Sequence, residues 1–377
     1  MLFNQCRVFF YTGTNMRRAP SVPPGPCLNL AGRMQPARLI ETIKNIRLQH
    51  IFITVFSCFL FIAFSCAASH AGTVTLKLAH TAEPNTPLGF GVEKLAELAY
   101  EYSRGELIVK VYHSGQIGSQ KELVERLRYG LVDMTTADTG FLSEYIPQLL
   151  VFELPFILRS NEHAYAALDT IGLEIARKGE GKGFKTLAIM ERSQLNICSG
   201  RAPGRDPKDL RGSYMRIRKD SHFSRLMLFY MGARPVYVDD QNLMNAAELG
   251  RIDGFECTPA QVWETKLPGV QKYVSVTAHS YSAQPVLVSM ARWKRLSSAQ
   301  REALLLAARD AADWQRALCR KQNTDYLLKI HDNAIADVFF KPDRKLFENA
   351  AVPVWKIFAS EYENGQQLID RIRDIPE

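Results

Sequence analysis

Two successive series of strands that alternate with helices constrain the fold of this chain more than any other feature. The first series spans residues 73–136 and the second spans residues 215–256. In both, apolar residues alternate over short stretches, as in strands, and recur every three or four residues between them, as in helices. Strands connected through helices form parallel sheets. We therefore predict an α/β fold with two lobes, each a mostly parallel sheet flanked by helices.

The same patterns predict the individual elements. The first series should contain strands at 73–78, 107–111 and 132–136 and helices at 87–103 and 121–129. The second should contain strands at 215–217, 234–238 and 252–256 and helices at 221–231 and 240–249. Elsewhere we expect an irregular packed segment at 147–156, a helix at 163–178, strands at 185–190, 195–198 and 286–290, and a loop at 200–207. Ser297 and Gln300 fit a capping box, and the helical pattern they begin should extend to about residue 340, either continuously or with one break, since no Gly or Pro interrupts it.

An uncharged apolar run at 51–64 indicates a leader that is not part of the fold. Arg38, Lys44 and Arg47 precede the run, and Ser69-His70-Ala71 follows it with small residues suited to cleavage. The run is too short for a comfortable membrane span. We interpret it as a secretory signal cleaved after Ala71, with an uncleaved membrane anchor as the alternative. The chain then divides into a leader at 1–71 and a two-lobed domain at 72–377, located in the periplasm.

Removing the leader changes the charge balance. The whole chain has 47 basic and 39 acidic residues, and the leader holds seven of the basic and one of the acidic ones. The remainder has 40 basic and 38 acidic residues, a net charge of +2. This excludes the strongly basic surface typical of nucleic-acid binding.

Three cysteines remain after the leader: Cys198, Cys257 and Cys319. They have no CxxC pattern and no spacing suited to zinc, so we predict neither a metal nor any other cofactor. Because Cys198 and Cys257 each end a predicted strand, one hypothesis joins them in a disulfide. The alternative is two separate thiols, since a bridge needs Cα atoms within about 7 Å.

Several motifs, taken in order, carry a resemblance to a known family. The main block reads DLRGSYMRIR at 209–218, MGARPV at 231–236 and AELGRIDGFE at 247–256. Upstream lie GQIGSQKE at 115–122, YGLVDM at 129–134 and VFELPFIL at 151–158. Together they resemble the solute-binding proteins of TRAP (tripartite ATP-independent periplasmic) transporters. The resemblance implies a long helix spanning both lobes. It also implies a receptor that captures a small carboxylate-containing organic acid in the interlobe cleft and delivers it to membrane permease subunits.

The resemblance also implies site residues. Arg216 would clamp the substrate carboxylate, because a planar guanidinium binds carboxylate through two parallel hydrogen bonds. Arg201 would be a second substrate-facing arginine or, alternatively, a solvated loop residue. Asp138 would bond substrate hydroxyl or amino groups, or cap a turn. The other candidates are Glu256, which ends the Asp-Gly-x-Glu motif, Cys257 in place of the usual Asn, Asp240 in a second variable region, and His80 at the end of the first strand.

Other functions have less support. The chain has no Gly-x-Ser-x-Gly, no His-Glu-x-x-His, no phosphate loop and no dinucleotide fingerprint, so we do not expect an enzyme. A periplasmic ligand-binding protein that serves a sensory receptor remains an alternative. The ligand could be a dicarboxylate, a sugar acid, a keto acid or an aromatic acid. We expect a monomer, with a dimer as the alternative.

Overall fold

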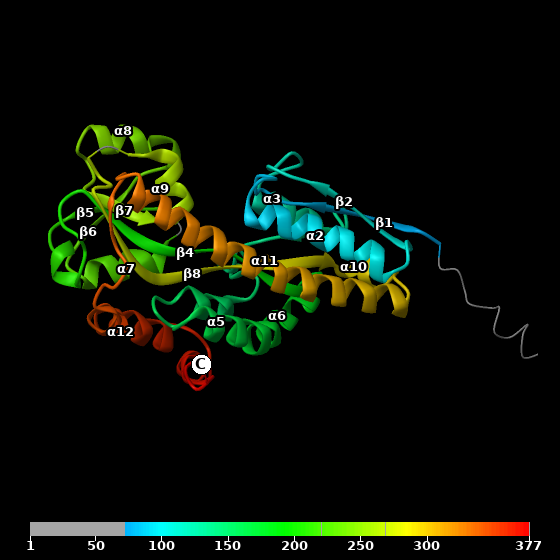
Figure 1. Ribbon diagram of the computed structural model, residues 1–377. Helices are drawn as coiled ribbons and strands as arrows, with labels where there is room; N and C mark the ends of the chain where they lie inside the picture. The colour runs from blue at the N-terminus through cyan, green and yellow to red at the C-terminus, as the bar shows by residue number, and fades with distance from the viewer. Residues whose placement is uncertain (1–71, 220, 268, 377) are drawn as a thin grey trace, which may run out of the picture. The chain divides into compact units, whose positions relative to one another are not determined.

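The structure, a computed structural model, describes residues 72–219, 221–267 and 269–376 (Figure 1). The predicted leader lies outside these residues. The described residues form one compact unit. Within the described ranges, no helix is both long and apolar enough to cross a membrane.

The first lobe follows the predicted order closely. Its elements are β1 (Val74–Ala79), α2 (Pro87–Tyr102), β2 (Leu107–Tyr112), α3 (Gln120–Arg128) and β3 (Met134–Thr136). β1 lies between β2 and β3 and is parallel to both. Because the three strands are parallel, their carboxyl ends meet at one edge of the sheet. His80 directly follows β1 and Asp138 lies two residues beyond β3.

The second lobe repeats this arrangement. Its elements are β5 (Tyr214–Ile217), α7 (His222–Tyr230), β6 (Arg234–Tyr237), η5 (Asp240–Asn242), α8 (Leu243–Glu248), β7 (Gly254–Cys257) and α9 (Pro259–Thr265). β5 lies between β6 and β7 and is parallel to both. Met215 and Ile217 are buried in the hydrophobic core, so strand alternation turns Arg216 to the opposite face.

Two long antiparallel strands join the lobes into a single nine-stranded sheet of order β2-β1-β3-β8-β4-β7-β5-β6, with β9 paired to β8. They are β4 (Phe184–Ser199) and β8 (Tyr273–Ser289). β8 pairs with β3 of the first lobe and β4 with β7 of the second. The predicted strands at 185–190 and 195–198 are therefore one strand, whose register shifts three times. The prediction at 286–290 found only the end of β8.

The connection between β3 and β4 is mostly helical. It contains α4 (Thr139–Leu142), the 3-10 helix η1 (Pro147–Glu153), α5 (Asn161–Ala167), the π-helical turn η2 (Leu168–Gly172), α6 (Leu173–Ala176) and η3 (Arg177–Lys182). The prediction of a helix at 163–178 is thus confirmed, although a π turn interrupts it. A short 3-10 helix, η4 (Pro207–Leu210), precedes β5, and α10 (Met290–Trp293) follows β8.

The long helix α11 (Ser298–Asp332) contacts elements of both lobes, including α2 in the first and α9 in the second (Figure 1). Its capping box at Ser297 and Gln300 is confirmed. The predicted end at residue 340 is wrong. Ala334 adopts a left-handed backbone conformation with φ of 49°, and the chain turns into β9 (Asp337–Phe339), which pairs with β8. Sheet pairing outweighs local helix propensity here.

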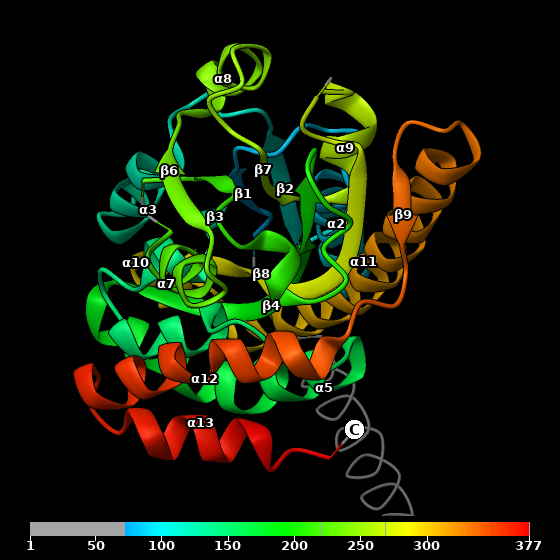
Figure 2. The ribbon, with the colours of Figure 1, turned by 90° about the vertical axis from the view of Figure 1, so that its left-hand side faces the viewer.

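Two helices that the sequence patterns did not reveal complete the fold. They are α12 (Arg344–Glu361) and α13 (Gly365–Arg373), and both lie on the same side of the sheet as α5 (Figure 2). α12 contacts α7, and α13 contacts η1. They enclose the largest hydrophobic cluster, which includes Phe223, Phe347 and Phe358.

Candidate functional site

Arg216 is held in one orientation on β5. Its side chain is only 4% exposed. Nε donates to the Val238 carbonyl at 2.8 Å, and Nη2 donates to Asp240 Oδ1 at 2.5 Å. Nε and Nη2 lie along one edge of the planar guanidinium, so these bonds occupy that edge. The other edge, formed by Nη1 and the second Nη2 hydrogen, has no partner among the described residues. It has the geometry that binds a carboxylate through two hydrogen bonds.

Asp240 accepts from Arg216 and lies close to a further cation. Arg218 Nε is 3.5 Å from the same Oδ1 atom. Partial burial acts to raise the pKa of Asp240, but the charges of Arg218 and Arg216 outweigh it and lower that pKa. Asp240 is therefore an anion that fixes Arg216 and faces Arg218. Arg218 was not among the candidates from the sequence.

Asp138 occupies the equivalent strand end in the first lobe. It is the N-cap residue of α4 but makes no capping hydrogen bond. Its Oδ2 lies 3.8 Å from Arg192 Nη1, whereas its buried Oδ1 has no hydrogen-bond partner among the described residues. Burial raises the pKa of Asp138, and the charge of Arg192, hydrogen bonding by Gln120 and Ser282 and the charge of Arg218 oppose that rise. The charge of Arg218 therefore acts on Asp138, although these residues belong to different lobes.

Arg192 is a site residue that the sequence analysis missed. It lies within β4, at the register shift between Glu191 and Ser193. Its side chain is 53% exposed beside Asp138. The sequence signal for this residue was a charge in the gap between the two predicted strands. Its place beside Asp138 follows only from the pairing of β4 with β8 and of β8 with β3.

Glu153 adds a second carboxyl group beside Asp138. Thr139 Oγ1 donates a hydrogen bond to it. Burial raises the pKa of Glu153 to about 7, against the effect of the Thr139 hydrogen bond, and the charge of Asp138 raises it further. Near neutral pH, Glu153 is therefore partly protonated.

Glu153 should make stability depend on pH. Between its ordinary pKa of 4.5 and the raised value of about 7, the folded chain holds a proton that the unfolded chain releases. Stability therefore falls as pH rises through 7. Glu153→Gln should remove this decline and stabilise the protein at pH 8 by about 1–3 kcal/mol, with little effect at pH 4.5. Urea unfolding at both pH values measures the difference. The exposed Glu144→Gln is the matched control, and parallel pH curves for parent and Glu153→Gln would contradict the assignment.

His80 is a neutral hydrogen-bond donor. It is fully buried, and its Nδ1 accepts from the Ala82 backbone N–H at 3.2 Å, which places the ring proton on Nε2. Nε2 has no partner among the described residues. Burial and then the neighbouring His113 lower the pKa of His80 to about 4. His80, which directly follows β1, thus has an unpaired Nε2–H, and its imidazole ring is uncharged at neutral pH.

Arg201 is not brought together with Arg216. Its Nη1 lies 3.5 Å from Asp253 Oδ2 and donates to the Gly212 carbonyl at 3.3 Å. Asp253 precedes β7 and accepts from the backbone N–H of Tyr214, the first residue of β5. Arg201 therefore lies at the amino ends of these strands, whereas Val238 and Asp240 hold Arg216 from beyond the carboxyl end of β6.

Glu256 and Cys257 point into packed surroundings. Glu256 Oε1 lies 3.0 Å from Nε2 of His279, and the two side chains are 8% and 1% exposed. Cys257 lies in a hydrophobic cluster that also holds Cys198. Both thiols are free, as is Cys319, so the structure does not contain the hypothesised disulfide. Burial raises the pKa of the Cys198 thiol well above its ordinary value, and the adjacent Cys257 thiol raises it further.

These thiols should be unreactive in the folded protein. The three cysteines of the described chain are all buried and free. A thiol reagent without reductant should therefore modify none of them in the native, processed protein and all three after denaturation. Finding a single reactive thiol in denaturant would instead mean that Cys198 and Cys257 had been oxidised to a disulfide.

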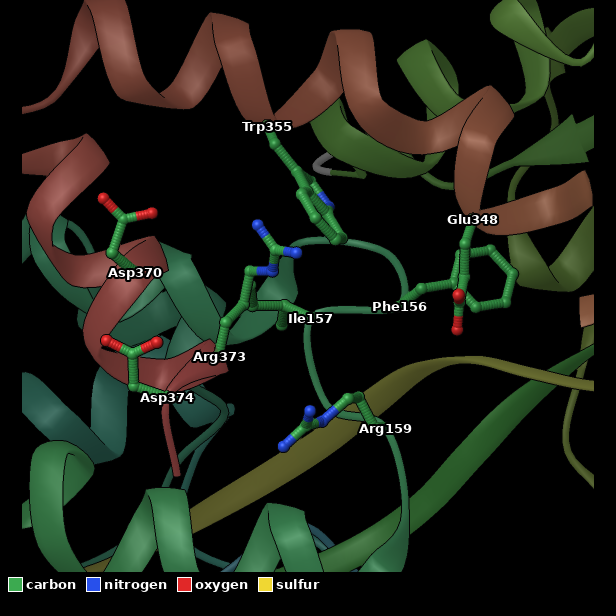
Figure 3. A pocket seen from close by; sticks show the side chains of 8 residues that line it. All are labelled: Phe156, Ile157, Arg159, Glu348, Trp355, Asp370, Arg373 and Asp374. Carbon is green, nitrogen blue, oxygen red and sulfur yellow. The ribbon is translucent and has the colours of Figure 1, made fainter. Parts of the chain in front are cut away.

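A pocket of about 280 Å³ lies elsewhere, between α12, α13 and the segment after Pro155 (Figure 3). Trp355 and Arg373 form one wall, with the guanidinium 5.5 Å from the ring centre. Arg159 and Asp374 also line it. None of the candidate residues contributes to this pocket. Among the described residues, no group of three or more His, Cys, Asp or Glu side chains could hold a metal ion.

A family model described as bacterial extracellular solute-binding protein, family 7, matches residues 78–361. The chain belongs to this family. The family 7 protein of Escherichia coli that is named for binding 2,3-diketo-L-gulonate is 27% identical over 75% of this chain and 86% of its own length. The C4-dicarboxylate-binding periplasmic protein of Rhodobacter capsulatus is 28% identical over 75% and 86%.

A solved structure supports both the fold and the family. A TRAP periplasmic solute-binding protein of Chromohalobacter salexigens, with bound D-glucuronate, is 26% identical with a TM-score of 0.71. The match covers 79% of this chain and 99% of that one. The resemblance to TRAP solute-binding proteins and the two-lobed α/β fold are therefore confirmed. This family 7 protein is a solute-binding receptor of the TRAP type.

Proposed function

We propose that the protein binds a small monocarboxylic acid rich in hydroxyl or keto oxygens, between its lobes, through Arg216. The observation that carries this proposal is the state of the Arg216 guanidinium. One edge is fixed by Val238 and Asp240, and the other has no partner among the described residues. A carboxylate on that edge would receive two hydrogen bonds from a donor that needs no reorganisation. The loaded receptor then delivers the acid to TRAP membrane permease subunits.

The charges around Arg216 favour a ligand with one negative charge. Three cations, Arg192, Arg216 and Arg218, face two anions, Asp138 and Asp240, and a partly protonated Glu153, which leaves a net positive charge of at most one. Arg201 and Asp253 balance each other. A monocarboxylate would neutralise the excess, whereas a dicarboxylate would leave a second charge without a partner when the site closes, which is costly. This argues against dicarboxylates and leaves sugar acids, keto acids and aromatic acids as the candidate ligand classes.

The first lobe offers donors for uncharged oxygens. His80 Nε2, Gln120 Nε2 and Gln284 Nε2 are buried and have no partner among the described residues. β3 and β8 pair Thr136 with Val286, and continuing this register places Gln284 opposite Asp138. Gln120 is close enough to that carboxylate to lower its pKa by hydrogen bonding, so His80 and Gln284 are the donors left for a ligand. Buried N–H groups left unpaired are costly, so hydroxyl or keto oxygens of a sugar acid would stabilise this side of the site.

The ligands of the relatives agree in part with a monocarboxylate. The E. coli relative is named for 2,3-diketo-L-gulonate and the C. salexigens structure contains D-glucuronate, and each of these acids has a single carboxylate. The R. capsulatus relative is named for C4-dicarboxylates. Because the charge balance around Arg216 favours a single carboxylate, we group this protein with the E. coli relative and the C. salexigens protein.

A thermal-shift screen tests the proposal. Sugar and keto acids should raise the melting temperature, because a ligand at 100 times its Kd stabilises the folded state by about 2.7 kcal/mol. Succinate and other C4 dicarboxylates should have a smaller effect at equal concentration. A larger shift with succinate would refute the monocarboxylate assignment, and no shift with any organic acid would refute the receptor assignment.

We also infer that the receptor is exported and processed. The support is the apolar run at 51–64, followed by Ser69-His70-Ala71. The processed protein should then begin at Gly72 and be recovered from the periplasm. N-terminal sequencing of the periplasmic protein checks the cleavage site, and a membrane-bound species that keeps residues 51–64 would contradict it.

A further inference from the structure

The long helix α11 bonds through its side chains to one edge of β4, where a neighbouring strand would otherwise pair. Among the described residues, β7 pairs with this edge only at Asn196–Ser199. Before that point, Gln315 Nε2 donates to the Glu191 carbonyl at 2.5 Å, and Gln315 Oε1 accepts from the Glu191 N–H at 2.9 Å. A residue of an antiparallel strand satisfies both backbone groups in the same way. The fully buried Gln315 therefore takes the place of one residue of a missing strand.

Two more side chains of α11 bond to the same stretch of backbone. Arg316 Nη2 donates to the Ile189 carbonyl at 2.6 Å, and the Cys319 thiol donates to the Arg192 carbonyl at 3.4 Å. Backbone groups buried without partners would be costly, so these bonds stabilise the edge of β4. The backbone of β4 at residues 189–192 is therefore held by α11 on the edge that faces away from β8.

Arg192 is the residue of this stretch whose position depends most on these bonds. Between Glu191 and Ser193, two steps along β4 match a single step along β8, so Arg192 is the extra residue of a bulge. A bulge redirects the side chain that it carries. Here the Arg192 guanidinium reaches the first lobe, where Nη1 lies 3.8 Å from Asp138 Oδ2. The ladder with β8 does not fix this residue, whereas α11 bonds to it and to Glu191 before it.

We propose that Gln315 is a positioning residue of the binding site: by holding the Glu191 backbone, it fixes the bulge from which Arg192 reaches Asp138. Arg192 adds to the positive charge that a ligand carboxylate neutralises. It also favours the ionised form of Asp138, which can accept from ligand hydroxyls. Gln315 acts on the site only through the backbone of β4. This inference rests on the proposed function, because Arg192 affects affinity only if the solute binds beside Asp138.

The first test needs no ligand. Burial raises the pKa of Asp138 and the charge of Arg192 opposes that rise, so moving Arg192 away should raise the pKa. Gln315→Met keeps the size of the side chain but removes both bonds to β4. NMR titration of the Asp138 carboxyl carbon should show a higher pKa in Gln315→Met and in Arg192→Ala, with no further rise in the double variant. Any other pattern, above all a rise in Arg192→Ala alone, overturns the proposal. The other groups that act on Asp138 are the same in all these variants: Gln120, Arg218, Ser282 and Glu153.

The affinity for D-glucuronate provides the second test. Arg192→Ala should lower it roughly two- to fivefold, as expected for a partly solvated charge. Gln315→Met should lose a similar factor in the parent protein and nothing more in the Arg192→Ala background, because both changes remove the same interaction. Calorimetry on the four proteins measures this cycle. Losses that multiply would mean that Gln315 affects binding by another route, which overturns the proposal.

Two further variants separate positioning from a general loss of stability. In Gly91→Ala, the new Cβ atom on α2 would lie 2.3 Å from Gln315 Cγ, so it should displace the amide and reproduce the loss of affinity without any change in α11. Leu304→Ala opens a cavity beside the same helix, in the core of the first lobe, and should lower the melting temperature while affinity stays normal. An equal loss of affinity in Leu304→Ala overturns the proposal. Failure of the proposed function looks different, because the parent protein would then bind no organic acid while the NMR result would stand.

Discussion

Replacing Arg216 with alanine should reduce ligand affinity by roughly 30-fold to several thousand-fold, because truncating one partner of a desolvated charge pair costs about 2–5 kcal/mol. The Arg216 side chain is 4% exposed, so little water screens its interaction with a bound carboxylate. The substitution also leaves Asp240 with Arg218 as its only close cation among the described residues. Calorimetry with the acid that gives the largest thermal shift measures the loss.

Two further variants make this test specific. Arg216→Lys should also bind poorly, because an ammonium cannot donate to Val238, Asp240 and both ligand oxygens in one plane. Arg201→Ala is the matched control, since Arg201 pairs with Asp253 at the amino ends of β5 and β7. It should lose far less affinity than Arg216→Ala. Near-normal affinity of Arg216→Ala would contradict the clamp.

The sequence predicts the two lobes well because each depends on local patterns. Apolar periods of two and of three to four residues place β1, α2, β2, α3 and β3 of the first lobe within a few residues of their observed bounds. The same periods could not predict that β4 and β8 run through both lobes. Long strands whose register shifts lose strict alternation, so only their regular ends were recognised.

The site is less predictable than the fold, because strand pairing assembles it from distant segments. Arg216 and Asp240 were both expected, and the structure brings them together. The sequence signal for Arg192 was only its position between two predicted strands, and Arg218 had none; their contacts with Asp138 and Asp240 place them in the site. Cys257 follows Glu256 directly, yet strand alternation turns the two side chains to opposite faces and buries the thiol in a hydrophobic cluster.

The pairing of Glu256 with His279 leads to the second large expected effect. His279→Leu should destabilise the protein by about 3–5 kcal/mol, because it leaves a buried carboxylate without its partner. Glu256 Oε1 and His279 Nε2 are 3.0 Å apart and the side chains are 8% and 1% exposed, so water cannot replace the lost donor. His279 also lies in a segment of β8 that bulges opposite Asn196, where the Phe156 N–H donates to its carbonyl. Thermal unfolding should show a decrease on the order of 5–15 °C.

The chain supplies its own control for this prediction. His113 and Glu93 form a similar pair at 2.7 Å, but the carboxylate is 54% exposed, so His113→Leu removes a screened contact and should cost at most about 1 kcal/mol. Equal losses in the two variants would show that burial of Glu256 is not the cause. The double variant His279→Leu/Glu256→Met should recover most of the stability, because it removes the unpaired charge together with its partner. If the double variant is as unstable as His279→Leu alone, the cost lies in packing around the bulge of β8 and not in the buried carboxylate.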